Sequence, residues 1–291
     1  MMKLKKIVTV AALTMLVAAG TSRAEMLQIK GSDTLINLVQ RMSEVYMEKN
    51  PGKMIAVTGG GSGTGIAALI NSKCDIANAS RGMKQSEVAQ ANAGGVDPVR
   101  VVVAMDGLSV IVSGNNMVDQ LTMDQLGKIF RGEITNWSEV GGKNMPIALY
   151  GRQSNSGTFG FFMEEVLKGD YSPKMKQMNG NAQIVEGIKN DLSGIGYVGV
   201  GYVKKVTGVK VLKVARNMNS PYASPLNADE VNSGIYPIAR PLNQYVNGTP
   251  GGAIKDFIAF ELSPEGQKIV EEEGFFPLPK DYIEYNKKAG F

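Results

Sequence analysis

Three turns rich in glycine and hydroxyl side chains each connect a short apolar stretch to a helical pattern. They are Gly31-Ser32-Asp33-Thr34, the stretch from Gly59 to Gly65, and the stretch from Arg152 to Thr158. A buried strand that leads through a tight turn into a helix is the repeating unit of parallel sheets covered by helices. The sequence therefore predicts an α/β fold. It also places the three turns beyond the carboxyl ends of strands, where ligands bind in such sheets.

The other periodicities of the chain extend this alternation of strands and helices. Apolar, β-branched stretches predict strands over residues 26–30, 53–58, 75–80, 99–105, 108–113, 147–151 and 194–200. Helical spacing and end signals predict helices over residues 35–49, 66–71, 84–92, 122–132 and 159–167, and a final helix over 263–274. The stretches 99–105 and 108–113 are interpreted as chain passing from one lobe to another, and residues 236–246 as a candidate return crossing.

The first 24 residues have the features of a secretory signal peptide. Three lysines precede an apolar run over residues 7–19, and Ser22-Arg23-Ala24 supplies small residues at a cleavage site. The apolar run is too short to span a bilayer. We therefore expect cleavage after Ala24 and an exported, periplasmic protein without an anchor. Removing the segment lowers Lys+Arg from 31 to 27, which equals Asp+Glu, so nothing indicates a nucleic-acid partner.

Composition also restricts the chemistry of the chain. The sequence contains no histidine, which removes the commonest general base and the commonest transition-metal ligand, and it excludes a Ser-His-Asp hydrolase. Cys74 is the only cysteine, so no internal disulfide is possible, and its neighbours indicate a buried thiol. We therefore expect neither a metal nor another cofactor.

The three turns together predict a site for a small oxyanion. The first N–H groups of a helix have no intrahelical acceptor, and the helix dipole places positive charge there. Hydroxyl groups add donors, and an arginine adds a planar fork for anion oxygens. The candidate residues are Ser32, Asp33, Thr34, Ser62, Gly63, Arg81, Arg152, Ser156, Gly157 and Thr158. Taken singly, each has an ordinary interpretation: Asp33 as a helix cap, Arg152 in a surface ion pair, and Arg81 as a surface arginine.

Asp33 bears on the identity of the anion. A carboxylate repels an anion unless that anion carries a proton to donate, as phosphate does near neutral pH and sulfate does not. A site that hydrogen-bonds such a proton can reject the analogue lacking it by roughly 10⁴–10⁵. Asp33 therefore favours phosphate over fully deprotonated oxyanions, provided that it faces the ligand.

At these residues the chain resembles the PstS-like family, the substrate-binding proteins of phosphate ABC transporters. The stretches that carry the resemblance span essentially the whole mature chain: 31–34, 58–65, 75–81, 129–137, 152–158 and 194–198. The resemblance implies a two-lobed periplasmic-binding-protein type II fold, each lobe a mainly parallel sheet flanked by helices, joined by two crossover segments. It also implies that phosphate is held between the lobes and delivered to an ATPase-driven membrane permease, and that this protein is not an enzyme. The expected boundaries are 25–107 for lobe 1, 108–238 for lobe 2 and 239–291 for the return to lobe 1. We expect the protein to be a monomer.

The resemblance assigns site residues but also has two departures. Thr34, Ser62, Arg152, Ser156, Gly157 and Thr158 fall on the family's phosphate-contacting positions. Well-known members of the family have an aspartate after the third strand that accepts the phosphate proton, where this chain has Ser80-Arg81. They also have an aspartate two residues after the loop arginine, where this chain has Ser154. We hypothesise that Asp33 takes the acceptor role and that Arg81 adds a donor or balances Asp33. Three alternatives remain open: a binding protein for sulfate, molybdate or tungstate, a secreted phosphomonoesterase, and an extracellular sensor or adhesin.

Overall fold

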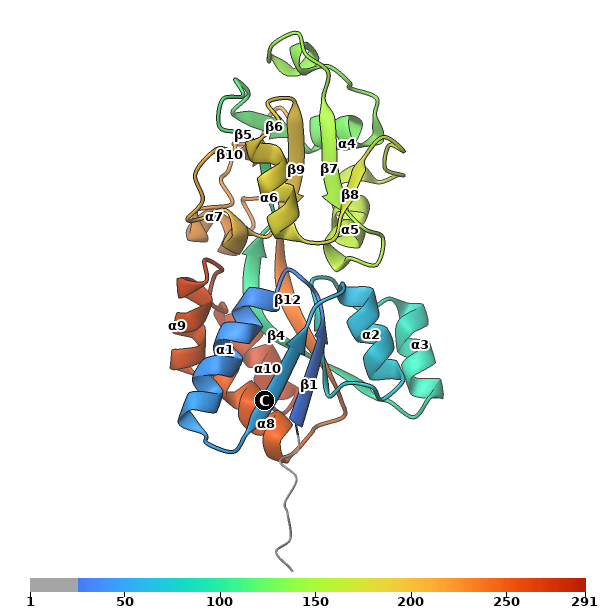
Figure 1. The fold of residues 1–291 in the computed structure, drawn as a ribbon, viewed down its shortest axis with the longest axis vertical. Coiled ribbons are helices and arrows are strands. Elements are labelled where there is room, and N and C mark those ends of the chain that lie inside the picture. Colours follow the sequence, from blue (N-terminus) through green and yellow to red (C-terminus); the bar gives the residue numbers. More distant parts are fainter. Residues whose placement is uncertain (1–25) are drawn as a thin grey trace, which may run out of the picture.

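The structure is a computed structural model that describes residues 26–291, so the predicted signal peptide lies outside the described residues. Two five-stranded sheets form two lobes stacked along the long axis of the molecule (Figure 1). The first sheet has the order β2 (Met54–Thr58), β1 (Met26–Gly31), β3 (Ile76–Ala79), β12 (Ala239–Asn247), β4 (Pro98–Gly107). The second has the order β10 (Val209–Val211), β5 (Ser109–Ser113), β9 (Gly194–Val198), β7 (Ala148–Arg152), β8 (Lys176–Met178).

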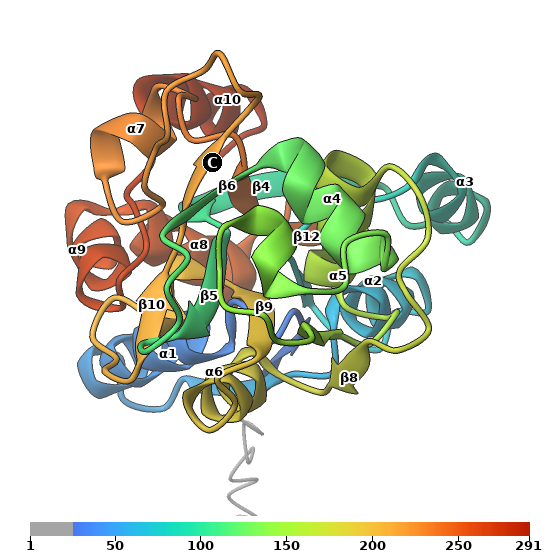
Figure 2. The ribbon, with the colours of Figure 1, turned by 90° about the horizontal axis from the view of Figure 1, so that it is seen from above.

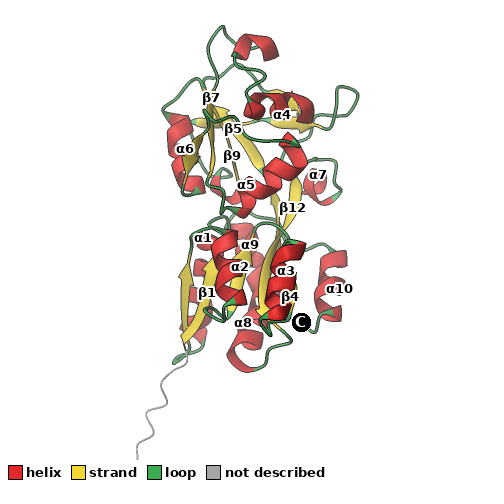
Figure 3. Cartoon of the chain, turned by 90° about the vertical axis from the view of Figure 1, so that its right-hand side faces the viewer, coloured by secondary structure: helices red, strands yellow, loops and turns green. Residues whose placement is uncertain are grey.

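Helices cover both faces of each sheet, as the α/β prediction requires. The first lobe carries α1 (Ile36–Lys49), α2 (Ser62–Ile70), α3 (Gln85–Ala93), α8 (Gly252–Leu262), α9 (Pro264–Glu272) and α10 (Lys280–Lys288) (Figure 3). The second carries α4 (Met123–Arg131), α5 (Gly157–Phe162) and α6 (Asn181–Lys189), and α4 and α6 lie on opposite sides of its sheet (Figure 2). The remaining elements are a short α7 (Ala228–Asn232), a two-stranded sheet of β6 (Gln120–Thr122) and β11 (Lys213–Ala215), and three short helical segments at Trp137–Val140, Met163–Leu167 and Val200–Tyr202.

Alternating burial along the strands explains this layering. In β3, Ile76 packs into the core that contains α1, whereas Ala77 and Ala79 pack into a separate cluster with α2 and α3. Successive side chains of a strand point to opposite faces, so a strand buried on both sides is apolar throughout. The continuous apolar stretch that predicted this strand reflects burial from both faces.

The sheets are mixed, which corrects the expectation of mainly parallel ones. In the first sheet β1 pairs in parallel with β2 and β3, but β12 is antiparallel to β3 and β4. In the second, β7 is parallel to β8 and β9, while β5 is antiparallel to β9 and β10. The antiparallel pairings involve the strands by which the chain leaves and re-enters a lobe.

Two helix predictions also need correction. The helix predicted from residue 66 begins at Ser62, because Gly60 and Gly61 complete the turn with positive φ angles of 110° and 89°. Its first turn is rich in glycine and hydroxyl residues, which are poor helix formers. The helix at α9 is not the last, since α10 follows it; Asn286 is the buried residue of α10, so no apolar stripe revealed that helix.

The two crossings between the lobes run side by side. β4 ends at Gly107 and β5 of the other sheet begins at Ser109, while the chain returns through Ile238 into β12. The Leu108 N–H donates to the Ile238 carbonyl over 3.0 Å, which joins the two crossings at the waist of the molecule. The boundaries expected at residues 107 and 238 lie at this waist and stay predictions. In the part of the chain described, no helix is both long and apolar enough to span a bilayer.

Candidate anion-binding site

The three predicted turns meet at the junction of the lobes. The first turn leaves β1, the second opens α2, and the third leaves β7 and opens α5 (Figure 1). Two contacts join the second and third turns: the Gly63 N–H donates to the Asn155 carbonyl (2.9 Å), and Asn155 Nδ2 donates to the Gly60 carbonyl (2.9 Å). The structure therefore brings together turns that are about a hundred residues apart in sequence and belong to different lobes.

Four buried hydroxyl groups lie at the centre of this junction, and we refer to Thr34, Ser62, Ser80 and Thr158 as the hydroxyl cluster. Thr34 Oγ1 is 2.8 Å from Thr158 Oγ1, and Ser80 Oγ is 3.2 Å from Thr158 Oγ1 and 3.3 Å from Ser62 Oγ. The Ser80 N–H donates to Ser62 Oγ over 3.0 Å. Because a hydroxyl can rotate, each of these groups can present a donor to an anion.

The close approach of the lobes depends on Gly157, the first residue of α5. A Cβ atom at this position would lie 2.3 Å from Ser62 Oγ and 2.9 Å from Ser80 Oγ. Only a residue without a side chain allows α5 to present its first backbone N–H groups so near the other lobe. The hydroxyl of Ser156 caps the same helix by accepting from the Phe159 N–H (3.4 Å).

Arg152 ends β7 and is 1% exposed. Its Nη2 donates to Asp33 Oδ2 (2.5 Å) and to the Asn179 carbonyl (2.9 Å), whereas Nε and Nη1 are buried without a hydrogen-bond partner in the described structure. A buried donor left unsatisfied costs about 1–3 kcal/mol, and more when it is charged. The guanidinium therefore keeps two donors available for a ligand that is not a protein group.

The second lobe holds Arg152 firmly in place. Its backbone N–H donates to the Tyr197 hydroxyl over 3.3 Å. The Tyr197 ring stacks on Phe162 with 4.2 Å between centroids, and it contacts Phe130 edge-on at 5.5 Å. Burial raises the pKa of Tyr197 to about 12, so this hydroxyl remains neutral at physiological pH. The arginine thus projects from an aromatic core into the junction.

Asp33 faces the junction and pairs with Arg152, not with Arg81. The other oxygen, Oδ1, accepts from the Gly60 N–H (2.9 Å), and the Asp33 carbonyl accepts from the Tyr202 hydroxyl (2.6 Å). The idea that Arg81 balances Asp33 is therefore wrong, because the Arg152 guanidinium already does so. Each carboxylate oxygen has two lone pairs, so these bonds leave Asp33 able to accept a further proton.

Three other candidate residues make contacts that do not involve the four hydroxyl groups of the cluster. Arg81 forms a double hydrogen bond with Glu87 (2.7 Å at each oxygen) and donates to the Gly82 carbonyl (2.8 Å). The Gly63 N–H is used by Asn155, as described above. Ser32 Oγ accepts from the Thr34 N–H (3.2 Å) and so shapes the first turn.

Sequence reasoning missed four polar residues at the junction. Ser80 directly follows β3, and the rule that ligands bind beyond the carboxyl ends of strands could have identified it. Arg240, Asp106 and Asn181 had no such local signal. Arg240 donates to Asp106, Ser80 and Thr158, and Asn181 is buried with its Nδ2 lacking a partner among residues 26–291.

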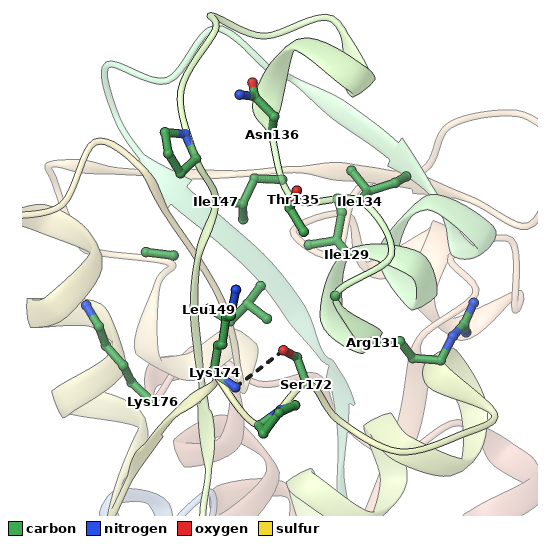
Figure 4. Close-up of a pocket in the computed structure, with 14 residues that line it drawn as sticks. Ile129, Arg131, Ile134, Thr135, Asn136, Ile147, Leu149, Ser172, Lys174 and Lys176 are labelled. Atoms are coloured by element: carbon green, nitrogen blue, oxygen red, sulfur yellow. Dashed lines mark hydrogen bonds between the residues drawn. The ribbon is translucent and has the colours of Figure 1, made fainter.

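The second lobe also contains a cavity of about 650 Å³ at a different place. Figure 4 shows it between the end of α4, the start of β7 and the segment 172–176, with Ile129, Ile134 and Leu149 among its lining residues. None of its lining residues belongs to the hydroxyl cluster or to Arg152. The candidate anion site is therefore separate from this cavity.

Comparisons with known proteins agree with the fold. A family model described as "PBP superfamily domain" matches residues 16–265. The phosphate-binding protein PstS of Pseudomonas aeruginosa is 34% identical over 272 residues, which cover 87% of this chain and 83% of that protein. PstS of Bacillus subtilis is 33% identical over 257 residues, covering 87% and 80%.

Solved structures give the same result. An ABC transporter substrate-binding protein of Clostridium perfringens, solved with bound phosphate, is 29% identical with a TM-score of 0.78 and covers 87% of this chain and 100% of that one. An ABC-type phosphate transport receptor of Vibrio cholerae is 28% identical with a TM-score of 0.71, with the same coverage. The chain belongs to the PBP superfamily, in the family that includes the PstS proteins of Pseudomonas aeruginosa and Bacillus subtilis.

Proposed function

We propose that this protein binds inorganic phosphate between its two lobes and delivers it to an ABC-type importer. The observation that carries the proposal is the buried Arg152 guanidinium, whose Nε and Nη1 lack a partner among the described residues, at a junction that also holds four buried hydroxyl groups. A small tetrahedral anion can accept from the arginine and from several hydroxyls at once. The phosphate-binding relatives support the choice of phosphate among such anions.

The contacts we propose come from both lobes. Thr34 and Ser62 supply hydroxyl donors from the first lobe, while Arg152, Thr158 and the backbone of Gly157 supply donors from the second. Ser156 holds the start of α5, and Ser32 and Asp33 hold the first turn and the arginine. Arg81 and Gly63 are not proposed as direct contacts, because Glu87 accepts from both Nη atoms of Arg81 and the Asn155 carbonyl accepts from the Gly63 N–H.

Binding and release follow from a change in the distance between the lobes. When the lobes separate about the two crossings, the donors of each lobe become hydrated. When they close, the same donors meet the anion in a site with little water, where each charge-assisted hydrogen bond is stronger.

We also propose that the lobe boundaries lie after residues 107 and 238. The protein is exported, with cleavage after Ala24, and acts in the periplasm as a monomer. Its partner is a membrane permease, and the chain itself performs no catalysis.

Calorimetry on protein stripped of ligand tests the proposal directly. Phosphate and arsenate, which both carry a proton near neutral pH, should bind and compete with each other, and sulfate should bind far more weakly. Binding of sulfate or molybdate in preference to phosphate would refute the assignment. A colorimetric assay of phosphomonoester hydrolysis on the same sample should give no turnover.

The variant Asp33→Asn tests whether Asp33 accepts the ligand proton. If it does, the variant should lose much of its preference for phosphate over sulfate, because an uncharged amide can donate to a deprotonated anion whereas a carboxylate can only accept and repels it. Asp75→Asn is a matched control: Asp75 accepts from the Gln28 N–H in the same lobe, and no hydrogen bond among residues 26–291 joins its side chain to the second lobe. An unchanged preference in Asp33→Asn would eliminate Asp33 as the acceptor without affecting the proposal that phosphate binds.

A further inference from the structure

A buried ion pair lies directly beside the hydroxyl cluster, on the two strands that cross between the lobes. Arg240 of β12 and Asp106 of β4 are register partners in the antiparallel pairing of these strands. Arg240 Nε and Nη2 donate to Asp106 Oδ2 over 2.9 and 2.8 Å. The two side chains are 2% and 0% exposed. The pair is therefore fixed at the point about which the lobes would move.

Each member of the pair contacts both lobes. Arg240 Nη1 donates to the Ser80 carbonyl of the first lobe (2.9 Å), and Nη2 also donates to Thr158 Oγ1 of the second (3.0 Å). The Arg240 guanidinium lies 5.0 Å from the centre of the Phe161 ring on α5. Asp106 Oδ1 accepts from the Val200 N–H of the second lobe (2.9 Å). All the contacts to the second lobe require the lobes to be close together.

The contact with Thr158 fixes the direction of a hydrogen bond. A guanidinium can only donate, so Thr158 Oγ1 must accept from Arg240. The hydroxyl then keeps its own proton for another acceptor, and the charge on Arg240 makes it a stronger donor. The charge of Arg240 is balanced by Asp106, so the pair adds little net attraction for an anion. Its effect on binding acts through the position and polarity of Thr158.

We propose that Arg240 is a positioning residue, which orients the Thr158 hydroxyl as a donor to the bound anion and makes closure of the lobes part of binding. This inference rests on the proposed phosphate function. Arg240 itself does not touch the ligand. Its guanidinium group donates to Asp106 on β4, to the Ser80 carbonyl after β3 and to Thr158 at the start of α5. It therefore holds the parts of the site from the two lobes in a fixed relative position.

The variant Arg240→Lys is the most informative perturbation. Lysine keeps the positive charge, and hence a partner for the buried Asp106, but a single ammonium group cannot reach Asp106, Ser80 and Thr158 in the geometry of the fork. Arg100→Lys is a matched control, because Arg100 lies on β4 and contacts Asn243 (2.7 Å), Tyr282 and Tyr285, all in the first lobe. If Arg240→Lys does not fold, the paired variant Arg240→Gln with Asp106→Asn removes both charges together and avoids an unpaired buried ion.

A double-mutant cycle, read by calorimetry with inorganic phosphate, tests the mechanism. Loss of a charge-assisted hydrogen bond predicts that Arg240→Lys raises Kd by about 10-fold or more, with Arg100→Lys unchanged. In a Thr158→Val background the Arg240→Lys effect should disappear, and in a Thr158→Ser background it should persist. Where Thr158→Val binds too weakly for calorimetry, the shift of the unfolding midpoint at millimolar phosphate gives the same comparison.

The possible results separate this inference from the proposed function. An Arg240→Lys protein with the phosphate Kd of the wild type overturns the inference, and so does an effect of equal size with Val or Thr at position 158. The second result would show that Arg240 supports the fold without acting through Thr158. Failure of the wild-type protein to bind phosphate would instead refute the proposed function.

Discussion

Replacing Gly157 with alanine should weaken phosphate binding while leaving each lobe folded. The added methyl group would lie 2.3 Å from Ser62 Oγ and 2.8 Å from Ser62 Cβ, where ordinary contacts begin near 3.4 Å. Ser62 belongs to the first lobe and Gly157 to the second. The clash therefore arises only when the lobes are together, and separating them by about an ångström relieves it.

The size of the effect follows from the cost of overpacking. An extra methyl group in a well-packed site typically costs about 1–3 kcal/mol, which corresponds to a Kd about 5- to 150-fold weaker. The backbone N–H of residue 157 is retained in the variant, so a lost donor does not contribute. Alanine also has a higher helix propensity than glycine, so the stability of α5 should not fall.

Calorimetry with phosphate, together with urea unfolding in the absence of ligand, separates binding from stability. Gly160→Ala is a matched control in the same helix, since a Cβ there would lie 3.5 Å from Arg81 Cδ, an ordinary contact. The reasoning is refuted if Gly157→Ala binds phosphate within twofold of the wild type. It is also refuted if Gly160→Ala weakens binding to the same extent, because the loss would then not come from the contact with Ser62.

Two further predictions concern buried titratable groups. Burial raises the pKa of Glu261 to about 8 from an ordinary value of 4.5, so the folded protein retains a proton that the unfolded chain releases. The contribution of Glu261 to the free energy of unfolding should therefore be greatest below pH 4.5. It should fall by up to about 1.4 kcal/mol per pH unit as the pH rises towards 8. Urea unfolding of Glu261→Gln at pH 5.5, 6.5 and 7.5 should show a flatter pH dependence than the wild type, and equal slopes would contradict the assignment. Burial also raises the pKa of the Cys74 thiol to about 12, so a disulfide reagent at pH 8 should modify it slowly in the native protein and quickly in urea; rapid native modification would contradict this.

The features that the sequence predicted well are those encoded locally. The turn at Gly31 and the capping box at Thr122, whose hydroxyl accepts from the Gln125 N–H, need only a few neighbouring residues to specify them. The buried thiol of Cys74 is confirmed for a similar reason, because it sits beside an apolar strand. Strands buried on both faces leave a continuous apolar stretch that is easy to locate.

Features that depend on the return of the chain were not predictable in this way. Arg240 and Asp106 are 134 residues apart, and they meet only because β12 inserts between β3 and β4. Glu261 lies in a helix whose pattern gives no sign that a carboxyl group is fully buried beside Gln244 (2.9 Å). In each case the environment of the side chain comes from sheet order, which the local pattern does not specify.

Asp33 shows how both kinds of information combine at one residue. The sequence predicted correctly that its turn lies at the junction, and the argument from charge alone made it a candidate acceptor for a ligand proton. The structure adds that Arg152 and Gly60 donate to its two oxygens, so Arg152 balances its charge when the lobes are together. The same carboxylate therefore holds the arginine in place whether or not it also accepts the ligand proton. Because Asp33 and Arg152 belong to different lobes, their pair requires the lobes to be together, so the closed arrangement that forms the anion site is also the one that holds its principal cation.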